Sequence, residues 1–171
     1  LPLSGYVLAI SPQDDVAKSL NFVYPQRLHF CQGGNERVYS VLNALNYLTE
    51  IADPNDWILV HDAARPCVSE ETLVDLVEHA LSSQNSSIVA IPVRDTLKRV
   101  ATAPQILHTV DRRELWQAQT PQMAPLGTLK AAIESALAAG VNITDEASAL
   151  EYEGHQVDVV QGRADNLKIT Y

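Results

Sequence analysis

An acid and a guanidinium stand three residues apart in this sequence, directly after a short apolar run. The run 57–60 (WILV) is followed by His61, Asp62, two alanines, Arg65 and Pro66. We expect the run to form a strand buried on both faces, which places Asp62 at the carboxyl end of the strand, where open parallel sheets bind their ligands. A carboxylate can ligate a divalent cation, and an arginine can bind phosphate oxygens through two parallel hydrogen bonds. The pair therefore suits a phosphate-bearing substrate and makes Asp62 a candidate metal ligand.

Simpler interpretations of these residues remain open. Asp62 can be a helix cap or a surface carboxylate, and Arg65 can be one half of a surface ion pair of little energetic value. We interpret His61 as a packed or hydrogen-bonded structural residue without a chemical role. Ala63 and Ala64 leave room for a ligand to approach the backbone.

A second candidate for ligand binding is the glycine pair in the stretch 33–37 (GGNER). It lies between a short predicted strand and a predicted helix, so its amides can face a ligand at a helix N-terminus. Ser40, one turn into that helix, could reach the same ligand. An ordinary strand-to-helix turn and a self-capping serine are the alternatives.

Two further candidates lie towards the end of the chain. Thr144 precedes two acids and is predicted to cap a helix, with a second role possible. Lys168 alternates with Leu167 and Ile169, which predicts an inward-facing lysine on a short strand. Such a lysine needs a partner charge, either a phosphate or an internal carboxylate such as Asp62 or Asp165.

Composition limits the class of protein. The chain has 171 residues, of which 46% are hydrophobic, so we expect one domain over 1–171 with one substantial core. A formal net charge of -9 disfavours binding to nucleic acid or to an anionic membrane. Two distant cysteines, Cys31 and Cys67, form neither a disulfide scaffold nor a zinc motif and indicate a cytoplasmic protein. We find no leader and no membrane-spanning apolar run.

The elements that must position these residues alternate between strands and helices. Strands are predicted over the β-branched or apolar runs 6–10, 28–31, 57–60, 88–93 and 157–160. Helical spacing covers 38–48, 73–81 and about 125–139, and another helix is predicted to begin after Thr144. This alternation is typical of the α/β class.

The segment of about 94–111 interrupts that alternation. Two stretches of alternating polar and apolar residues flank a turn that contains Pro104, which predicts a β-hairpin. A two-stranded ribbon alone is only marginally stable in water, so its apolar face must pack on this domain or on a second subunit. We favour an arm that contacts a second subunit.

Seven motifs in order resemble those of one enzyme family. They are GGNERVYSV, ILVHDAARPC, IPVRDTLKR, HTVDR, QTPQ, ITDEASALEY and GRADNLKIT, and they extend over nearly the whole chain from Gly5 to Thr170. Together they resemble bacterial 2-C-methyl-D-erythritol 4-phosphate cytidylyltransferases. The resemblance implies a Rossmann-like, mostly parallel nucleotidyltransferase sheet with a β-hairpin dimerisation arm. It also implies a homodimer that transfers a cytidylyl group from CTP to methylerythritol phosphate with Mg²⁺, in the non-mevalonate pathway to isoprenoids.

The resemblance further implies roles for individual residues. Asp62, Lys168 and Arg112 become the expected catalytic residues, with Asp62 as the metal ligand. The residues implied for CTP are Gly34, Asn35, Arg37, Ser40, Asp62 and Ala63. Those implied for methylerythritol phosphate are Arg65, Thr120 of the QTPQ turn, Thr144 and Lys168 from one subunit, with Thr96 and Arg112 from the arm of the partner. Asn35 stands where relatives can carry an acid, although an amide oxygen can accept the same hydrogen bond.

The sequence departs from the family pattern at its ends. It begins at what resembles the family's second strand, without the glycine-rich triphosphate loop, and it stops before the family's terminal helix. We therefore expect the chain as given to be inactive or nearly so, because that loop stabilises the charge that accumulates in the transition state. Two alternatives remain: another polyol-phosphate cytidylyltransferase, or a non-catalytic dimerising module that binds a ligand.

Overall fold

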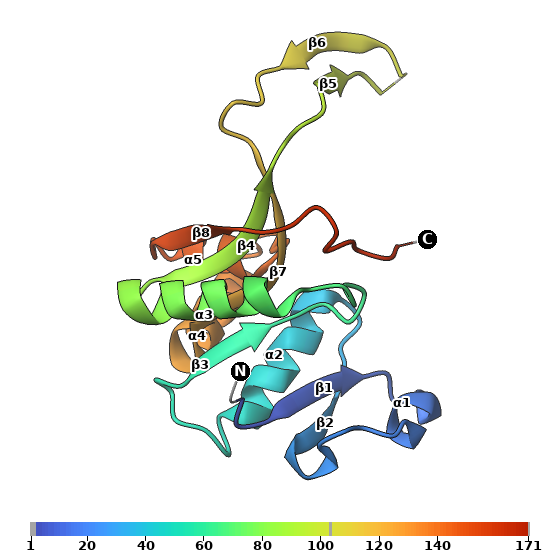
Figure 1. Cartoon of the computed structure of the whole chain (residues 1–171), viewed down its shortest axis with the longest axis vertical. Helices are drawn as coiled ribbons and strands as arrows, with labels where there is room; N and C mark the ends of the chain where they lie inside the picture. The colour runs from blue at the N-terminus through green and yellow to red at the C-terminus, as the bar shows by residue number, and fades with distance from the viewer. Residues whose placement is uncertain (1–2, 103, 171) are drawn as a thin grey trace.

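The predicted alternation of strands and helices is confirmed in the computed structural model, which describes residues 3–102 and 104–170 (Figure 1). In chain order the elements are β1 (Tyr6–Ile10), α1 (Asp15–Ser19), a 3₁₀ turn (Pro25–Arg27), β2 (Leu28–Gln32), α2 (Arg37–Leu48), β3 (Trp57–Val60), α3 (Glu70–Ser83), β4 (Ser86–Pro92), β5 (Leu97–Val100), β6 (Ile106–Val110), β7 (Trp116–Pro125), α4 (Leu126–Ala138), α5 (Glu146–Tyr152) and β8 (Val157–Gln161). Helix α1 and strand β7 were not predicted.

The main sheet is mixed, so the prediction of a mostly parallel sheet is wrong. Its strand order is β3-β7-β4-β8, in which β7 runs antiparallel to both β3 and β4, and only β4 and β8 are parallel. The reason is the excursion between β4 and β7. The chain leaves the sheet along β4 and returns along β7 beside it, which makes the two strands antiparallel. Strands β1 and β2 form a separate parallel pair.

Strand β3 is packed on both faces but less deeply than predicted. Ile58 and Val60 pack against the core formed by α2, α4 and α5, while Trp57 and Leu59 pack against the core beneath α3. All four side chains are only half-buried. Because β3 lies at an edge of the four-stranded sheet, neighbouring strands cover it on one side only.

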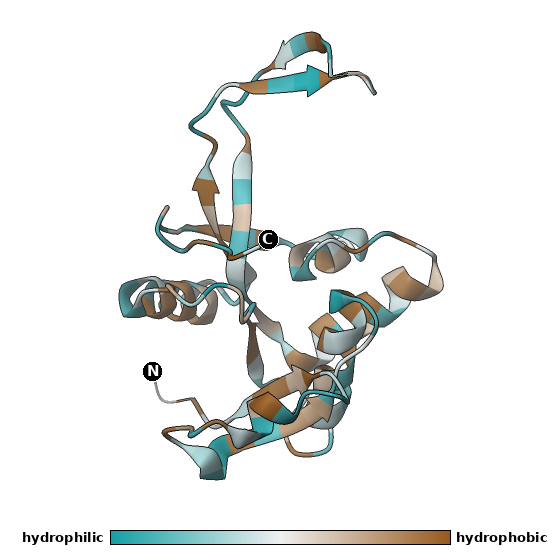
Figure 2. Cartoon of the chain, turned by 90° about the vertical axis from the view of Figure 1, so that its right-hand side faces the viewer, coloured by the Kyte–Doolittle hydropathy of each residue, from teal (hydrophilic) through white to brown (hydrophobic). Residues whose placement is uncertain are grey.

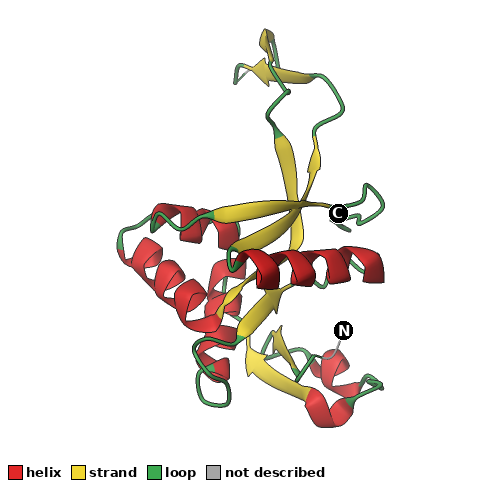
Figure 3. Ribbon diagram, turned by 60° about the vertical axis from the view of Figure 1, so that its left-hand side comes forward, coloured by secondary structure: helices red, strands yellow, loops and turns green. Residues whose placement is uncertain are grey.

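The helices enclose the sheet from two sides, as Figure 3 shows. The larger core lies between the sheet and α2, α4 and α5, and it includes the fully buried Leu126, Leu129 and Ile133 of α4. The smaller core lies under α3 and contains Leu76 and Val89. No helix in the described part of the chain is both long and apolar enough to cross a membrane.

The predicted hairpin is confirmed. Strands β5 and β6 pair antiparallel, and the ribbon projects away from the helices and the sheet (Figure 1). Position 103, which falls between β5 and β6 in the sequence, lies outside the described residues. Hydrophobic residues occur along the ribbon (Figure 2), and Val100, Ile106 and Leu107 are all exposed. This chain by itself therefore leaves an apolar arm surface uncovered.

Candidate active site

Asp62 lies in the loop after β3, between two cationic side chains. Its Oδ1 accepts a hydrogen bond from Arg37 Nε at 2.8 Å, and its Oδ2 is 2.8 Å from Lys168 Nζ. These partners come from the first residue of α2 and from the segment after β8. Only the fold brings the three together, since 25 residues separate Arg37 from Asp62 in the chain. The pairing of Lys168 with an internal carboxylate, one of the two alternatives in the sequence, is therefore the one observed.

The predicted short strand around Lys168 is absent among the described residues. Residues 167–170 have no regular secondary structure, and Leu167 and Ile169 are exposed. The segment is instead anchored to the loop after β3, where Ile169 N donates to Ala64 O at 2.8 Å. The ion pair with Asp62, and not strand alternation, therefore orients Lys168.

Arg37 also pairs with a buried acid. Its Nη1 and Nη2 donate to the two carboxylate oxygens of Glu146, at 2.6 and 2.9 Å. Glu146 is the first residue of α5, and its side chain is only 3% exposed. The sequence pattern gave this residue no role beyond the helix dipole, because sequence alone does not show that a charge becomes buried.

The ion pairs with Lys168, Arg37 and Glu146 keep Asp62 and Arg37 charged. Burial acts to raise the pKa of Asp62, but hydrogen bonds from Lys168 and Arg37 outweigh it and lower that pKa below the usual value. Burial likewise acts to lower the pKa of Arg37, and the contacts with Glu146 and Asp62 reverse this and raise that pKa well above its usual value. Asp62 is thus an anion, and Arg37 a cation, throughout the neutral pH range.

A hydrogen-bonded chain fixes the backbone of the loop that carries Asp62. Asp62 N donates to Thr120 Oγ1 at 3.0 Å, and His61 Nδ1 lies 3.1 Å from the same hydroxyl. The other ring nitrogen of His61 lies 2.9 Å from Arg65 O and must donate, because a carbonyl oxygen only accepts. With His61 neutral, Nδ1 then accepts from the Thr120 hydroxyl. This arrangement supports the structural interpretation of His61.

Thr120 does not lie in a turn, contrary to the prediction for the QTPQ motif. It is a buried residue within β7, and the peptide bond between Thr120 and Pro121 is cis. The sequence did not predict β7, so it could not assign this residue to a strand. In the structure the Thr120 side chain joins the sheet to the Asp62 loop.

Arg65 lies beside the segment that carries Lys168. Its Nη1 donates to Asn166 O at 2.7 Å. Asn166 is buried, and its amide donates to Gln119 Oε1 and Thr120 O. Arg65 Nε is buried without a hydrogen-bond partner among the described residues. The guanidinium is therefore held on one side and has donor capacity left over.

The glycine pair has a structural explanation. Gly34 N donates to Ser40 Oγ at 3.0 Å, and a Cβ built on Gly34 would lie 2.3 Å from Tyr39 Cβ. Only glycine permits this close approach of the turn to α2. Gly34 and Asn35 are nevertheless exposed at the start of the helix, so they stay accessible to a ligand.

Thr144 is not the cap of α5, so that prediction is wrong. The cap is Asp145, whose side chain accepts from Ser148 N while the Ser148 hydroxyl accepts from the backbone of Asp145. Thr144 lies one residue outside the helix, with its N–H bonded to Ser148 Oγ at 3.1 Å. Asp145 caps the helix because its carboxylate accepts a hydrogen bond from a free amide of the first turn, that of Ser148. The exposed side chain of Thr144 stays accessible.

The two remaining predicted residues are not part of this cluster. Thr96 precedes β5 and Arg112 follows β6, and both are exposed. Figure 1 shows that these strands project away from the loop after β3. Nothing within the described chain brings the arm residues to Asp62.

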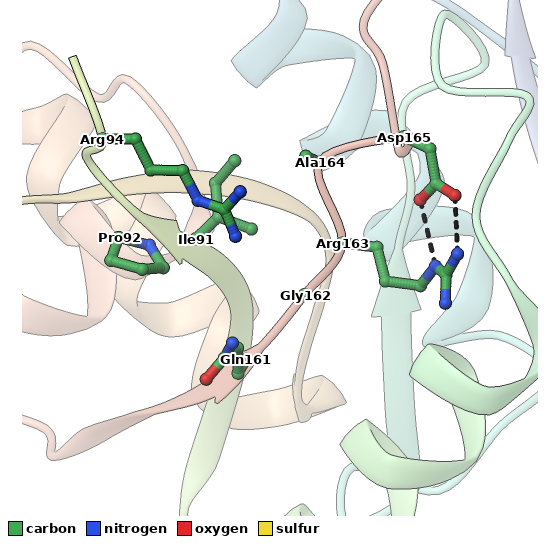
Figure 4. A pocket seen from close by; sticks show the side chains of 8 residues that line it. All are labelled: Ile91, Pro92, Arg94, Gln161, Gly162, Arg163, Ala164 and Asp165. Atoms are coloured by element: carbon green, nitrogen blue, oxygen red, sulfur yellow. Dashed lines mark hydrogen bonds and ion pairs between the residues drawn. The ribbon is translucent and has the colours of Figure 1, made fainter.

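A separate cavity of 380 Å³ opens where the arm leaves the sheet. Figure 4 shows Arg94 on one side of it and Arg163 on the other, with Arg163 held by two hydrogen bonds to Asp165. Its lining comes from the end of β4 and the segment after β8. No motif in the sequence indicated this cavity.

The residues around Asp62 are compatible with a Mg²⁺ ion held mainly by substrate. No group of three or more His, Cys, Asp or Glu side chains suited to a metal occurs among residues 3–102 and 104–170. Mg²⁺ commonly takes one or two carboxylates and completes its shell with water and phosphate oxygens. The ionised Asp62 supplies one such carboxylate.

Comparisons with known proteins indicate one enzyme family. A family model described as 2-C-methyl-D-erythritol 4-phosphate cytidylyltransferase matches residues 3–171. A relative from Acinetobacter baumannii (strain SDF), which bears the family's name, is 62% identical over all of this chain and 72% of its own length. Another from Vibrio vulnificus is 46% identical over 98% of this chain and 71% of its own length.

Solved structures agree as well. The crystal structure of a Francisella tularensis 2-C-methyl-D-erythritol 4-phosphate cytidylyltransferase has a TM-score of 0.84 and 38% identity, covering 98% of this chain and 76% of that one. A 4-diphosphocytidyl-2C-methyl-D-erythritol synthase has a TM-score of 0.86 and 42% identity, covering 96% and 76%. The chain therefore belongs to the 2-C-methyl-D-erythritol 4-phosphate cytidylyltransferase family.

Proposed function

We propose that the Asp62 cluster is the centre at which this family's reaction takes place: CTP and 2-C-methyl-D-erythritol 4-phosphate give 4-diphosphocytidyl-2-C-methyl-D-erythritol and pyrophosphate. The observation that carries the proposal is the convergence of Arg37 and Lys168, from distant segments, on one ionised carboxylate. Surface ion pairs rarely join three segments in this way, whereas sites for phosphate chemistry need fixed cations and a cation-binding acid together.

The reaction is a direct displacement. A phosphate oxygen of 2-C-methyl-D-erythritol 4-phosphate, the acceptor, attacks the α-phosphorus of CTP and forms a new P–O bond. The bond between the α-phosphorus and the bridging oxygen breaks, and pyrophosphate leaves with that oxygen. Negative charge grows on the oxygens around the reacting phosphorus, so catalysis consists of positioning and of electrostatic stabilisation. No activated nucleophile of the protein is needed.

Lys168 is the side chain of the described site best placed for that stabilisation. Its ammonium is anchored by Asp62 yet its side chain is 41% exposed, so it can also contact phosphate oxygens. Asp62 would hold the divalent cation, which when bound neutralises charge on the phosphates. Arg37 fixes the other oxygen of Asp62 and thereby the orientation of the carboxylate.

The acceptor and the nucleotide are assigned to different sides of Asp62. Arg65 and the exposed Thr144 are proposed to bind the phosphate of the acceptor, and the bond from Arg65 Nη1 to Asn166 O, which fixes the guanidinium, supports this. Thr120 contributes by holding the Asp62 loop. The start of α2, with Gly34, Asn35, Ser40 and the exposed Ala63 opposite, is proposed to receive CTP. Free backbone amides at a helix start favour an anionic ligand.

A homodimer is proposed to complete the acceptor site. Thr96 and Arg112 are exposed on the arm and lie outside the Asp62 cluster, and the arm also exposes apolar side chains. A second copy that packs on this apolar surface would supply both residues to the site of the first. We place the enzyme in the cytoplasm, in keeping with two free cysteines.

The direct test is pyrophosphate release from CTP, methylerythritol phosphate and Mg²⁺. It is run on the 171-residue chain and on a fusion that places the N-terminal segment of the Acinetobacter baumannii relative before Leu1. We expect the 171 residues alone to be nearly inactive, because they hold no glycine-rich loop ahead of β1 to bind the triphosphate. Activity of the fusion supports the proposal. A silent fusion that still binds methylerythritol phosphate would instead indicate a binding module.

A further inference from the structure

Glu146 is a buried charge that its own helix does not require. The N-terminus of α5 is already capped by Asp145 and Ser148, yet the Glu146 side chain is only 3% exposed. A buried carboxylate is unfavourable unless it is paired and hydrogen-bonded. The partner here is Arg37, which gives both terminal nitrogens to the two oxygens of Glu146. The reason for burying Glu146 must therefore be sought at Arg37.

The contact with Glu146 limits what Arg37 can do at Asp62. A guanidinium prefers to bind a carboxylate through two parallel hydrogen bonds. Arg37 gives that two-bond contact to Glu146 and only one bond, from Nε, to Asp62 Oδ1. Asp62 Oδ2 is left to Lys168 Nζ, at 2.8 Å.

We propose that Glu146 is a positioning residue of this site, which holds Arg37 in its one-bond contact and so reserves the second oxygen of Asp62 for Lys168. The expected effect on turnover rests on the proposed function. The effect on the contact between Asp62 and Lys168 does not, and it can be tested without turnover. Glu146 contacts neither Asp62 nor Lys168 through a hydrogen bond in the described structure, so its influence passes through Arg37.

Loss of the Glu146 charge has a defined expected result. Freed from its partner, Arg37 can present two N–H groups to Asp62, and that fork competes with the single ammonium of Lys168 for the carboxylate. Lys168 then loses its anchor. The substitution Glu146→Gln removes the charge and keeps the shape of the side chain. Glu151→Gln is the matched control, because Glu151 lies on the same helix and is exposed.

The first readout is the rate at which each lysine amine reacts with limiting acetic anhydride, measured by peptide mass spectrometry. Lys130, paired with Glu134 at 2.6 Å on α4, serves as the internal reference. We expect E146Q to raise labelling of Lys168 relative to Lys130 by about two- to fivefold, the size of one lost exposed ion pair. The control E151Q should leave the ratio unchanged.

The double variant separates positioning from general damage. In R37Q/E146Q no guanidinium remains to compete for Asp62, so the ratio should return to that of the unsubstituted chain. A ratio that stays high in the double variant would overturn the proposal, because Lys168 would then be freed without competition from Arg37. Labelling of Lys130 that rises in parallel with that of Lys168 in E146Q would also overturn it, because it would show that the fold has loosened in general. An unchanged ratio in E146Q would overturn it as well.

The second readout is turnover in the fusion described above. We expect E146Q to lower kcat by about 10- to 100-fold with little change in the KM for CTP, because residues that orient a catalytic group act on the transition state. A change in KM alone would contradict the assignment. If the unsubstituted fusion shows no turnover, the proposed function fails, while the labelling ratios still decide whether Glu146 positions Arg37.

Discussion

Arg37 and Arg112 are both implied in substrate binding by the family resemblance, yet their surroundings are opposite. Arg37 touches two carboxylates from different segments and is partly buried. Arg112 is exposed in the segment between β6 and β7, with no side-chain hydrogen bond to any part of the chain that the structure describes. The Asp62 cluster is thus assembled within one chain, whereas the arm holds its proposed substrate-binding residues away from that cluster. The difference teaches that a single chain preforms only part of the proposed acceptor site.

The largest effect is expected for Asp62→Asn in the fusion. The neutral amide cannot hold a divalent cation as a carboxylate does, and it loses the charge that orients Lys168. We expect kcat/KM to fall by about 100- to 1000-fold, the size typical of a lost electrostatic element. The measurement is pyrophosphate release. Asp111→Asn is the control, because Asp111 is an exposed acid whose partner among the described residues is its near neighbour Arg113. Equal activity of the two variants would remove Asp62 from the mechanism.

A mixture of two inactive variants tests whether the arm completes a neighbouring site. Arg112→Ala alone should lose activity, because one phosphate contact is gone. Co-expression of R112A with D62N should restore about a quarter of full activity, because half of randomly paired dimers are hybrids and each hybrid has one intact site. Complementation would confirm that Arg112 acts in trans. No recovery from a mixture shown by mass to contain hybrids would place Arg112 and Asp62 in the same subunit.

The apolar arm surface predicts a weaker but measurable effect on assembly. Ile106→Lys places a charge where Ile106 is 59% exposed on the free chain, and we expect the proposed dimer to dissociate at least about tenfold more readily. Ile51→Lys is the matched control, since Ile51 is 56% exposed and lies far from the arm in the sequence. Sedimentation across a concentration series measures the shift. Equal dissociation of both variants would show that the arm is not the interface.

The smallest effect concerns the pH dependence of the free energy of unfolding at the Asp62 cluster. The pKa of Asp62 is lower in the folded chain than its unfolded value of 3.8, so its pairs stabilise the fold above that value and lose this contribution as the pH falls through the folded pKa. The contribution is on the order of 1 kcal/mol, because both partners are partly exposed. Urea unfolding near neutral pH and near pH 3 should show a smaller loss on acidification in D62N than in the unsubstituted chain. An equal loss would contradict the assigned pairs.

Local sequence signals predicted most of the elements. Helical spacing predicted α2, α3 and α4, which the structure confirms, because this periodicity acts within a few residues. Strand β7 was missed. Its polar segment 117–122 (QAQTPQ) does not alternate like a half-buried strand, yet residues 119–122 are buried where β7 lies between β3 and β4. The parallel sheet was wrongly predicted for the same reason, since β7 is the strand that reverses the direction.

For the candidate site, the sequence predicted a ligand site in the loop after β3 and an inward-facing Lys168 that needs a partner charge. It left the partner of Lys168 open and treated Glu146 as part of a helix start. Whether an acid is buried depends on what packs around it, and Arg37 reaches Glu146 across 109 positions of the chain.

The sequence by itself determined the kinds of side chain present, the local elements and the family, because those depend on residue type and on order along the chain. Tertiary structure alone decided that Asp62 lies between Arg37 and Lys168, that Glu146 is buried against Arg37, and that the arm points away from both. The physical reason is that ion pairs and desolvation act over a few ångströms of space, whatever the distance along the chain.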